Sequence, residues 1–341
     1  MKNIVIIGAG VAGLSAASIL KEKGYDVTII EKKAYDGGNV ASWDRLFPDS
    51  RRAGRLIDDV KRPLGDGVTI HYDQSITSLV KMKDGRIGVK TDSLETIHAD
   101  ALLVASGFSL FDAHLKEEYG YGIYDNVYTQ ADLESMFNAG KVLTRSGDAP
   151  RRIGFVHCVG SRDEKVGNRY CSKVCCVTAV KQASEIKQLY PDAQVYCFYM
   201  DLRMFELPYE DMYFNAQKLY GVRFIRGRLC EAAEKMDKSV VLKVEDTLAG
   251  QTMNLSVDML VLMAGMRPAS DTARIATMLG LHCGKEGFLT PVDIFSRSNE
   301  TEVDGVFLAG TCTGPKTIPQ TIADARSAAI RIDEYLKKRK K

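Results

Sequence analysis

Apolar residues recur along the chain in short runs that alternate with stretches of helical spacing, the pattern of an α/β protein. Residues 2–7 read as a buried strand, residues 9–23 as a helix ended by Gly24, and residues 26–31 as a second strand. Weaker alternating segments then predict a small antiparallel meander and a buried strand, at residues 69–72, 76–81, 86–91 and 100–105.

A second α/β run begins near Arg152, after a mixed stretch between residues 110 and 150 that carries loop residues. We expect strands, in chain order, at residues 153–158, 194–200, 222–225, 239–244, 252–255, 259–264 and 305–309. Helices are expected at residues 130–138, 175–190, 210–220 and 319–336. Two similar α/β halves are therefore predicted, followed by a short basic tail at residues 337–341, which we interpret as solvated.

Composition limits the classes of partner. The chain has 46 Lys and Arg against 44 Asp and Glu, a net charge of +2, so no global field favours nucleic acid. No apolar run approaches the roughly 18 residues of a membrane span. The N-terminus enters a strand by Ile4 without the pattern of a signal peptide, and a cytoplasmic location is expected. Eight cysteines are too few for a disulfide scaffold, yet four of them fall between Cys158 and Cys176.

A glycine-rich turn follows the first strand. Gly8, Gly10 and Gly13 form G-x-G-x-x-G with Val11 and Ala12, and Glu31 ends the next strand. Gly8 allows the tight turn, Gly10 lets the backbone approach a pyrophosphate, and Gly13 lets the helix pack on the strand. The helix N-terminus offers N–H groups to an anion, and Glu31 could accept from a ribose hydroxyl. The first α/β unit is therefore predicted to bind a dinucleotide.

Three further motifs decide between FAD and NAD. Gly37-Gly38, the strand end Ala105-Ser106-Gly107 and the late stretch 306–310 together resemble the two-dinucleotide flavoproteins to which thioredoxin reductase belongs. The resemblance implies FAD, and backbone N–H groups of Thr317 and Ile318 near the reduced flavin ring. Gly310-Thr311 stands where the family usually has Gly-Asp. The cofactor-binding residues implied are Gly8, Gly10, Val11, Ala12, Gly13, Glu31, Lys32, Gly38, Asn39, Ala105, Ser106, Gly107, Gly310, Thr311, Lys316, Thr317 and Ile318.

The same resemblance implies a thioredoxin-reductase-like fold with discontinuous domains. Residues 1–112 and 258–341 are expected to form a Rossmann-like FAD domain, residues 151–257 an inserted, smaller lobe like a nicotinamide domain, and residues 113–150 a connection. Two features of thioredoxin reductases are missing: a second G-x-G-x-x-G and a Cys-x-x-Cys pair. The second lobe therefore has the outline of a nicotinamide domain without its phosphate-binding turn.

Cys158, Cys171, Cys175 and Cys176 form C-x12-C-x3-C-C. If Cys171 and Cys175 are helical, they lie on one face of the helix, one turn apart. Cys158 lies at the end of the expected strand 153–158. Four thiolates could hold a [4Fe–4S] cluster or a tetrahedral zinc ion. The remaining alternative is that these cysteines are small buried apolar residues. Their concentration within nineteen residues favours a metal centre, and we expect iron and sulfur there.

The residues around these cysteines resemble the HdrA subunit of heterodisulfide reductase and its relatives. The match rests on Cys158-Val159-Gly160-Ser161-Arg162, on residues 170–176 and 179–183, and on Gly310-Thr311-Cys312. The resemblance implies FAD with a nearby [4Fe–4S] cluster, and an electron-transfer subunit of a heterodisulfide-reductase-like complex in sulfur or disulfide metabolism, of the short kind found in sulfur oxidisers. Partner subunits and a homodimer are implied. The alternatives are a self-sufficient NAD(P)H-dependent disulfide reductase and a zinc-stabilised binding scaffold.

Several cations lie close to the cysteines in the sequence. Lys181, five positions after Cys176, is either a surface lysine or a neighbour of the flavin or cluster with a catalytic role. Arg162, Arg169 and Lys173 either offset the negative charge of a thiolate-bound cluster or are solvated loop charges. The sequence alone leaves both questions open.

Overall fold

The computed structural model describes residues 1–93 and 95–339, and the chain divides into two compact units. Unit 1 consists of Met1–Ala41, Ala53–Ser109 and Arg267–Lys341, and unit 2 of Ser42–Arg52 and Leu110–Met266. The second unit thus includes Ser42–Arg52, the expected connection and residues 258–266, which differs from the predicted boundaries. Residues 259–264 join unit 2 because their strand pairs with the strand that begins at Arg152.

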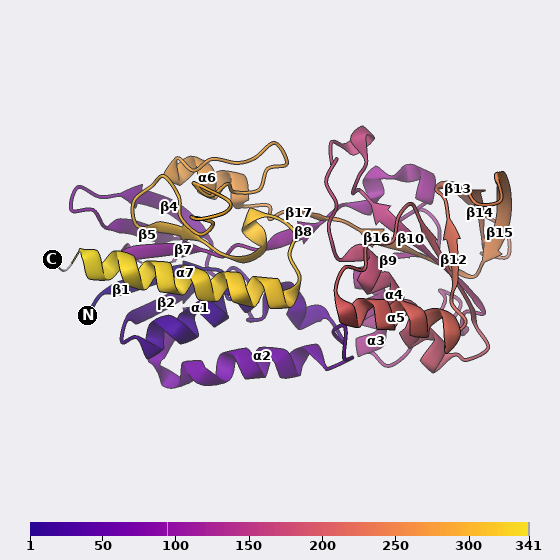
Figure 1. The fold of residues 1–341 in the computed structure, drawn as a ribbon, viewed down its shortest axis with the longest axis horizontal. Coiled ribbons are helices and arrows are strands. Elements are labelled where there is room, and N and C mark those ends of the chain that lie inside the picture. The colour runs from indigo at the N-terminus through magenta and orange to yellow at the C-terminus, as the bar shows by residue number, and fades with distance from the viewer. Residues whose placement is uncertain (94, 340–341) are drawn as a thin grey trace. The chain divides into compact units, whose positions relative to one another are not determined.

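Unit 1 is built on a parallel sheet with the strand order β18-β7-β1-β2-β3 (Figure 1). Its strands are β1 (Asn3–Ile7), β2 (Asp26–Ile30), β3 (Val68–His71), β7 (Ala101–Val104) and β18 (Val306–Leu308). A separate antiparallel meander consists of β4 (Ile76–Lys81), β5 (Ile87–Thr91) and β6 (Ile97–Ala99). The helices are α1 (Val11–Glu22), α2 (Ala53–Lys61), α6 (Thr272–Leu279) and α7 (Ile318–Lys338).

Alternation along β1 divides the core of unit 1 into two layers. Ile4 and Ile6 pack in a cluster with α1 and α7, whereas Val5 and Ile7 pack with the meander and α6. Successive side chains of a strand point to opposite faces of the sheet, so a strand covered on both faces is apolar throughout. One expectation was wrong: residues 69–72 were assigned to the meander, but β3 pairs in parallel with β2.

Unit 2 repeats the architecture with the parallel order β12-β11-β10-β16-β9. Its strands are β9 (Val127–Thr129), β10 (Arg152–Val159), β11 (Gln194–Tyr199), β12 (Arg223–Arg226) and β16 (Met259–Ala264). The helices are α3 (Gln130–Asn138), α4 (Cys175–Leu189) and α5 (Leu207–Lys218). An antiparallel sheet is formed by β13 (Leu229–Glu234), β14 (Val240–Asp246) and β15 (Gln251–Val257). A two-stranded sheet pairs β8 (Phe108–Leu110) with β17 (Met266–Pro268), and each of these two strands contains a boundary between the units. Ile153 and Phe155 face the helices, and Val156 faces the antiparallel sheet.

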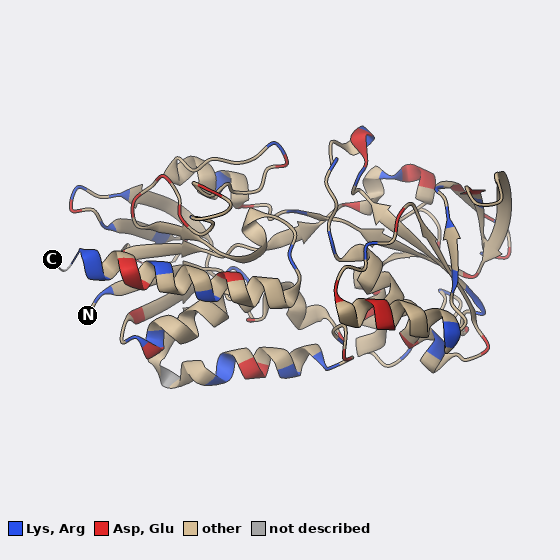
Figure 2. Ribbon diagram, in the orientation of Figure 1, with Lys and Arg blue, Asp and Glu red and all other residues tan. Residues whose placement is uncertain are grey.

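Charges of both signs are interspersed along surface helices such as α2 and α7 (Figure 2). In the described part of the chain, no helix combines the length and the apolar character needed to span a bilayer. The interspersed charges agree with the near-neutral composition.

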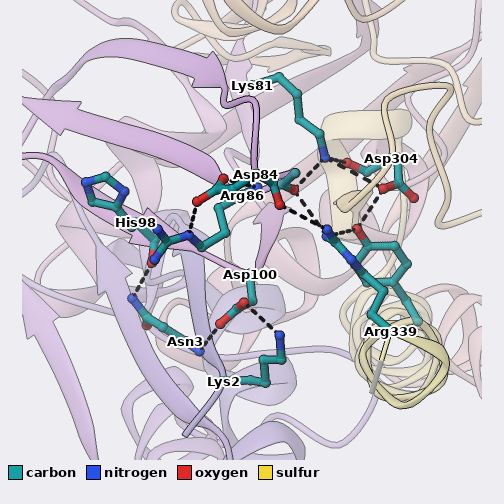
Figure 3. A network of polar contacts seen from close by, with 11 residues as sticks. Lys2, Asn3, Lys81, Asp84, Arg86, His98, Asp100, Asp304 and Arg339 are labelled. Atoms are coloured by element: carbon teal, nitrogen blue, oxygen red, sulfur yellow. Dashed lines mark hydrogen bonds and ion pairs between the residues drawn. The ribbon is translucent and has the colours of Figure 1, made fainter. Parts of the chain in front are cut away.

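A polar network ties both ends of unit 1 to its meander (Figure 3). Asp100 accepts from the backbone N–H of Asn3 at 2.9 Å and lies 3.1 Å from Lys2 Nζ. At the other end, Arg339 Nη1 donates to the carbonyl oxygen of Gly85 at 3.1 Å. Arg339, which we expected in a solvated tail, is therefore bonded to the turn between β4 and β5, while residues 340 and 341 lie outside the described residues.

Candidate functional site

The glycine-rich turn brings β1 and α1 into close contact. Gly8 has a φ of +105°, and a Cβ on Gly13 would lie 1.9 Å from the carbonyl oxygen of Gly8. Gly10 also lies close to Gly38, because a Cβ on Gly38 would lie 3.1 Å from the Cα of Gly10. No side chain caps the N-terminus of α1, and its first turn, which begins with Val11 and Ala12, has no acidic residue. The turn and helix therefore suit the approach of a pyrophosphate.

Glu31 directly follows β2 and is buried. Its Oε2 accepts the N–H of Ala9 at 2.7 Å, and its Oε1 accepts the N–H of Lys33 at 2.9 Å. The carboxylate thus fixes the glycine-rich turn, and each of its oxygens keeps a lone pair for a further donor. Lys32 Nζ lies 3.4 Å from Asp271 Oδ1, and Asn39 Nδ2 donates to the carbonyl oxygen of Phe108 at 2.9 Å.

The strand ends of β7 and β18 meet the same edge of the sheet, because neighbouring parallel strands end together. Ser106, between Ala105 and Gly107, has a buried Oγ without a hydrogen-bond partner among the described residues. Gly310 has a φ of +77°, and a Cβ there would lie 2.8 Å from the Cβ of Ala12. A Cβ on Gly107 would lie 4.0 Å from Thr311 Oγ1. The predicted cofactor residues of four strand ends are therefore gathered at one edge.

Asp324 on α7 contacts the predicted cofactor loop and was not among the residues predicted from the sequence. Its Oδ2 accepts the N–H of Gly310 at 2.8 Å and lies 3.6 Å from Lys316 Nζ, which also donates to the carbonyl oxygen of Gly310 at 2.9 Å. The sequence held one signal for it: Gly310-Thr311 lacks the carboxylate that the family usually has in this motif. The helix supplies an acid to this loop from outside the motif.

Thr317 caps α7 through a capping box with Gln320. Its N–H donates to Gln320 Oε1 at 3.2 Å, and its Oγ1 accepts the N–H of Gln320 at 3.4 Å. The backbone N–H of Thr317, expected to be available to a flavin, is therefore already engaged. Ile318, the other expected donor, is the first residue of α7.

Three of the four clustered cysteines meet in unit 2. Cys158 lies at an irregularity of β10 between Val156 and Val159, with a φ of +60° that is unusual for a residue with a Cβ. Cys175 and Cys176 open α4. Hydrogen bonding of the Cys175 thiol to the sulfurs of Cys158 and Cys176, together with burial, raises the pKa of Cys175 well above its ordinary value. Contact with Cys175 correspondingly lowers the pKa values of Cys158 and Cys176, which favours their thiolate forms.

Cys171 lies on the loop before α4 and is partly exposed. Its sulfur accepts the backbone N–H of Lys173 at 3.3 Å. Within residues 1–93 and 95–339, no group of three or more His, Cys, Asp or Glu side chains is placed to hold a metal ion. The donor set itself, four thiols with a backbone N–H directed at one sulfur, suits an iron–sulfur cluster in kind. The four-cysteine centre stays a prediction.

The loop that carries these cysteines is held by its own polar groups. Ser172 Oγ accepts the N–H of Met266 at 2.8 Å and is hydrogen-bonded to Ser161 Oγ at 2.5 Å. Asn168 Nδ2 donates to the carbonyl oxygen of Gly160 at 2.8 Å. These bonds fix the chain between β10 and α4, where a nicotinamide domain would carry its glycine-rich turn.

Lys181 is buried, so its interpretation as a surface lysine was wrong. Its Nζ lies 2.6 Å from Glu134 Oε1 and 3.1 Å from Glu185 Oε2. Gln182 Nε2 also donates to Glu134 Oε1, at 2.7 Å. The ammonium group is thus part of an ion triad within unit 2, and its expected place next to the flavin stays a prediction.

A comparison with protein families matches residues 2–160 and 165–329 to the pyridine nucleotide-disulphide oxidoreductase family. The fold is similar to that of thioredoxin reductase from T. acidophilum, with a TM-score of 0.68 and 19% identity over 99% of each chain. This similarity confirms the predicted fold.

Two relatives belong to heterodisulfide reductases. The chain is 33% identical to the HdrA-type iron-sulfur subunit of the CoB–CoM heterodisulfide reductase of Methanocaldococcus jannaschii, over 96% of this chain and 63% of that protein. It is 45% identical to the corresponding subunit of the H2/formate:CoB-CoM heterodisulfide,ferredoxin reductase of Methanococcus maripaludis, over 68% of this chain and 36% of that protein. The chain thus spans less than two thirds of either relative, and the resemblance to HdrA is confirmed. The chain belongs to the pyridine nucleotide-disulphide oxidoreductase family and is an oxidoreductase.

Proposed function

We propose that the chain is an FAD- and [4Fe–4S]-containing electron-transfer subunit of a heterodisulfide-reductase-like complex. The observation that carries the proposal is the contact of the Cys175 thiol with the thiols of Cys158 and Cys176 at the junction of β10 and α4. A nicotinamide domain would place a phosphate-binding turn at this junction. Thiols in place of glycines favour a metal-centred redox group over a bound nicotinamide.

The FAD half of the proposal rests on the edge of the unit 1 sheet. The N-terminus of α1 would receive the pyrophosphate, and Glu31 would accept from a ribose hydroxyl. The loop after β18, with Gly310 next to Ala12, would lie along the cofactor. The bound flavin would supply chemistry that exchanges electrons in pairs. The protein residues bind and orient it, and the Asp324 carboxylate holds the Gly310 backbone in place.

The cluster half rests on unit 2. Cys158, Cys171, Cys175 and Cys176 would ligate the cluster, which would supply one-electron transfer. The positive φ values of Cys158, Arg162 and Lys173 support this assignment, because backbone strain persists where the surroundings impose it and is common at functional sites.

The names of the relatives support a place in disulfide metabolism. Since the chain spans less than two thirds of their length, its partner subunits, its homodimer and its cytoplasmic location are part of the proposal. Short subunits of this type would pass electrons between a flavin and a partner subunit that carries the sulfur substrate. The self-sufficient NAD(P)H-dependent disulfide reductase remains the competing function, which the family name favours.

An anaerobic reductive titration followed by visible absorption tests the proposal. With dithionite, we expect about three electrons per chain, two for the flavin and one for the cluster. Uptake of about two electrons would contradict a cluster, and absence of a flavin band would contradict the whole proposal. With NADPH as the reductant, the flavin band should stay unbleached. Rapid bleaching by NADPH would favour the competing function.

A further inference from the structure

Three cations of the cysteine loop are distinguished by their surroundings. The side chain of Arg169 is 78% exposed and lies 3.3 Å from the carboxylate of Glu164. Lys173 is also exposed. The side chain of Arg162, by contrast, is only 22% exposed. Since water screens exposed charges strongly, Arg162 is the cation of the three whose charge acts most strongly on a nearby centre.

Arg162 is held in place from two sides. Its Nη2 donates to Asp201 Oδ2 at 2.7 Å, and its backbone N–H donates to the carbonyl oxygen of Tyr170 at 3.0 Å. Asp201 follows β11, and its backbone oxygen lies 3.7 Å from the sulfur of Cys176. The Asp201 carboxylate therefore holds one amino group of the guanidinium, Nη2, and does not engage the other, Nη1.

The other end of the guanidinium lacks a partner. Nη1 of Arg162 is buried and has no hydrogen-bond acceptor among the described residues. A buried donor without an acceptor is costly, and the cost is larger when the group is charged. Burial alone would lower the pKa of Arg162, but the bond to Asp201 and the charges of Cys158 and Cys171 raise it. Besides Asp201, the negative groups whose charge acts on this guanidinium are the sulfurs of Cys158 and Cys171, and a thiolate sulfur can accept a hydrogen bond.

We propose that Arg162 donates a hydrogen bond from Nη1 to a sulfur of the thiolate-bound cluster and thereby raises its reduction potential. This inference rests on the proposed function. Reduction by one electron, supplied by a reduced flavin, adds one negative charge to the centre and takes up no proton. A fixed and partly desolvated cation stabilises the reduced form more than the oxidised form, because the reduced form carries more negative charge. Arg162 thus acts as a positioning and tuning residue.

A redox titration monitored by EPR on the anaerobically purified full chain tests the inference. Arg162→Gln should lower the equilibrium constant for cluster reduction about tenfold, which is 59 mV for one electron. Arg169→Gln is the matched control, and its potential should equal that of the wild type because Arg169 is exposed. Arg162→Lys should recover part of the loss, since it keeps the charge without the planar fork.

Iron content is measured on the same samples, which separates the two claims. A wild type without iron would refute the proposed function. If Arg162→Gln kept the iron content of the wild type and its cluster had the same reduction potential, the inference alone would be refuted. Should Arg162→Gln fail to assemble, the wild type with ¹⁵N only in the guanidinium groups of its arginines provides the second measurement, because the backbone N–H of Arg203 is hydrogen-bonded to Cys176 and must stay unlabelled. Pulsed EPR should then detect a ¹⁵N coupling that persists in Arg169→Gln, and the absence of any such coupling would overturn the inference.

Discussion

Nζ of Lys181 lies 2.6 Å from Oε1 of Glu134, and both side chains are buried in unit 2. The partners come from different helices, with Lys181 on α4 and Glu134 on α3, and Glu185 one turn further along α4 completes the triad. Glu134 also accepts the backbone N–H of Asp44 at 2.9 Å through its second oxygen. The triad therefore holds the segment Ser42–Arg52 against the helices of unit 2.

Replacing Lys181 should destabilise unit 2. Lys181→Met leaves two buried carboxylates without their counter-ion, and we expect a loss of about 3–5 kcal/mol in the free energy of unfolding, measured in urea. Lys218→Met, at the exposed C-terminal end of α5, is the control and should change the stability by less than about 0.5 kcal/mol. Equal stabilities of the two variants would contradict a structural role of the triad.

Glu185 should make stability depend on pH. Burial raises the pKa of Glu185 to about 7, and its attraction to Lys181 opposes this shift only in part. Because the folded state holds the proton more tightly than the unfolded state, this contribution to stability is present at low pH and is lost as the pH rises through 7. Glu185→Gln should therefore stabilise the protein at pH 8 by about 3 kcal/mol and flatten the profile between about pH 5 and pH 7. If the free energy of unfolding measured in urea fell as steeply between about pH 5 and pH 7 in Glu185→Gln as in the wild type, the raised pKa of Glu185 would be contradicted.

Gly13 should be indispensable for the glycine-rich turn. Gly13→Ala places a Cβ 1.9 Å from the carbonyl oxygen of Gly8, so the helix must move away from β1. We expect a stability loss of about 1–3 kcal/mol and FAD binding weakened at least about tenfold, measured by flavin fluorescence. Gly54→Ala on α2 is the matched control, because a Cβ there would contact nothing within 4 Å. The control should bind FAD normally and gain up to about 1 kcal/mol.

Cys175 should be required for iron. Cys175→Ser removes the thiol that contacts both Cys158 and Cys176, and we expect iron per chain to fall to a small fraction of the wild-type value in anaerobic preparations. Cys230→Ser, at an exposed cysteine of β13, should keep the full iron content. Retention of iron in Cys175→Ser would remove this residue from the ligand set.

The parts of the fold that the sequence predicted are set by local signals. In the glycine-rich turn, a Cβ on Gly8 would lie 2.5 Å from the carbonyl oxygen of Ala105, and a Cβ on Gly13 would lie 1.9 Å from that of Gly8. The strand before the turn is apolar on both faces. The sheet to which β3 belongs was not predicted correctly, because the alternating pattern of residues 69–72 does not show that this strand pairs with β2.

Contacts between distant residues were not predictable in the same way. Lys181 could be a surface lysine or a site residue on its own helix, because its partner Glu134 lies 47 positions earlier. Likewise, Arg162 is the partly buried cation of the cysteine loop, and its partner Asp201 lies 39 positions later. The boundary of unit 2 depends on Ser42–Arg52, whose place is fixed by a hydrogen bond from Asp44 to α3. Each of these features is a property of tertiary packing.

The composition of one anaerobic preparation tests the central claim most directly. FAD, iron, acid-labile sulfide and zinc are quantified per chain in the untreated wild type. The account predicts about one FAD with about four iron and four sulfide per chain and no stoichiometric zinc. Zinc in a stoichiometric amount without iron, or protein without flavin, would contradict it.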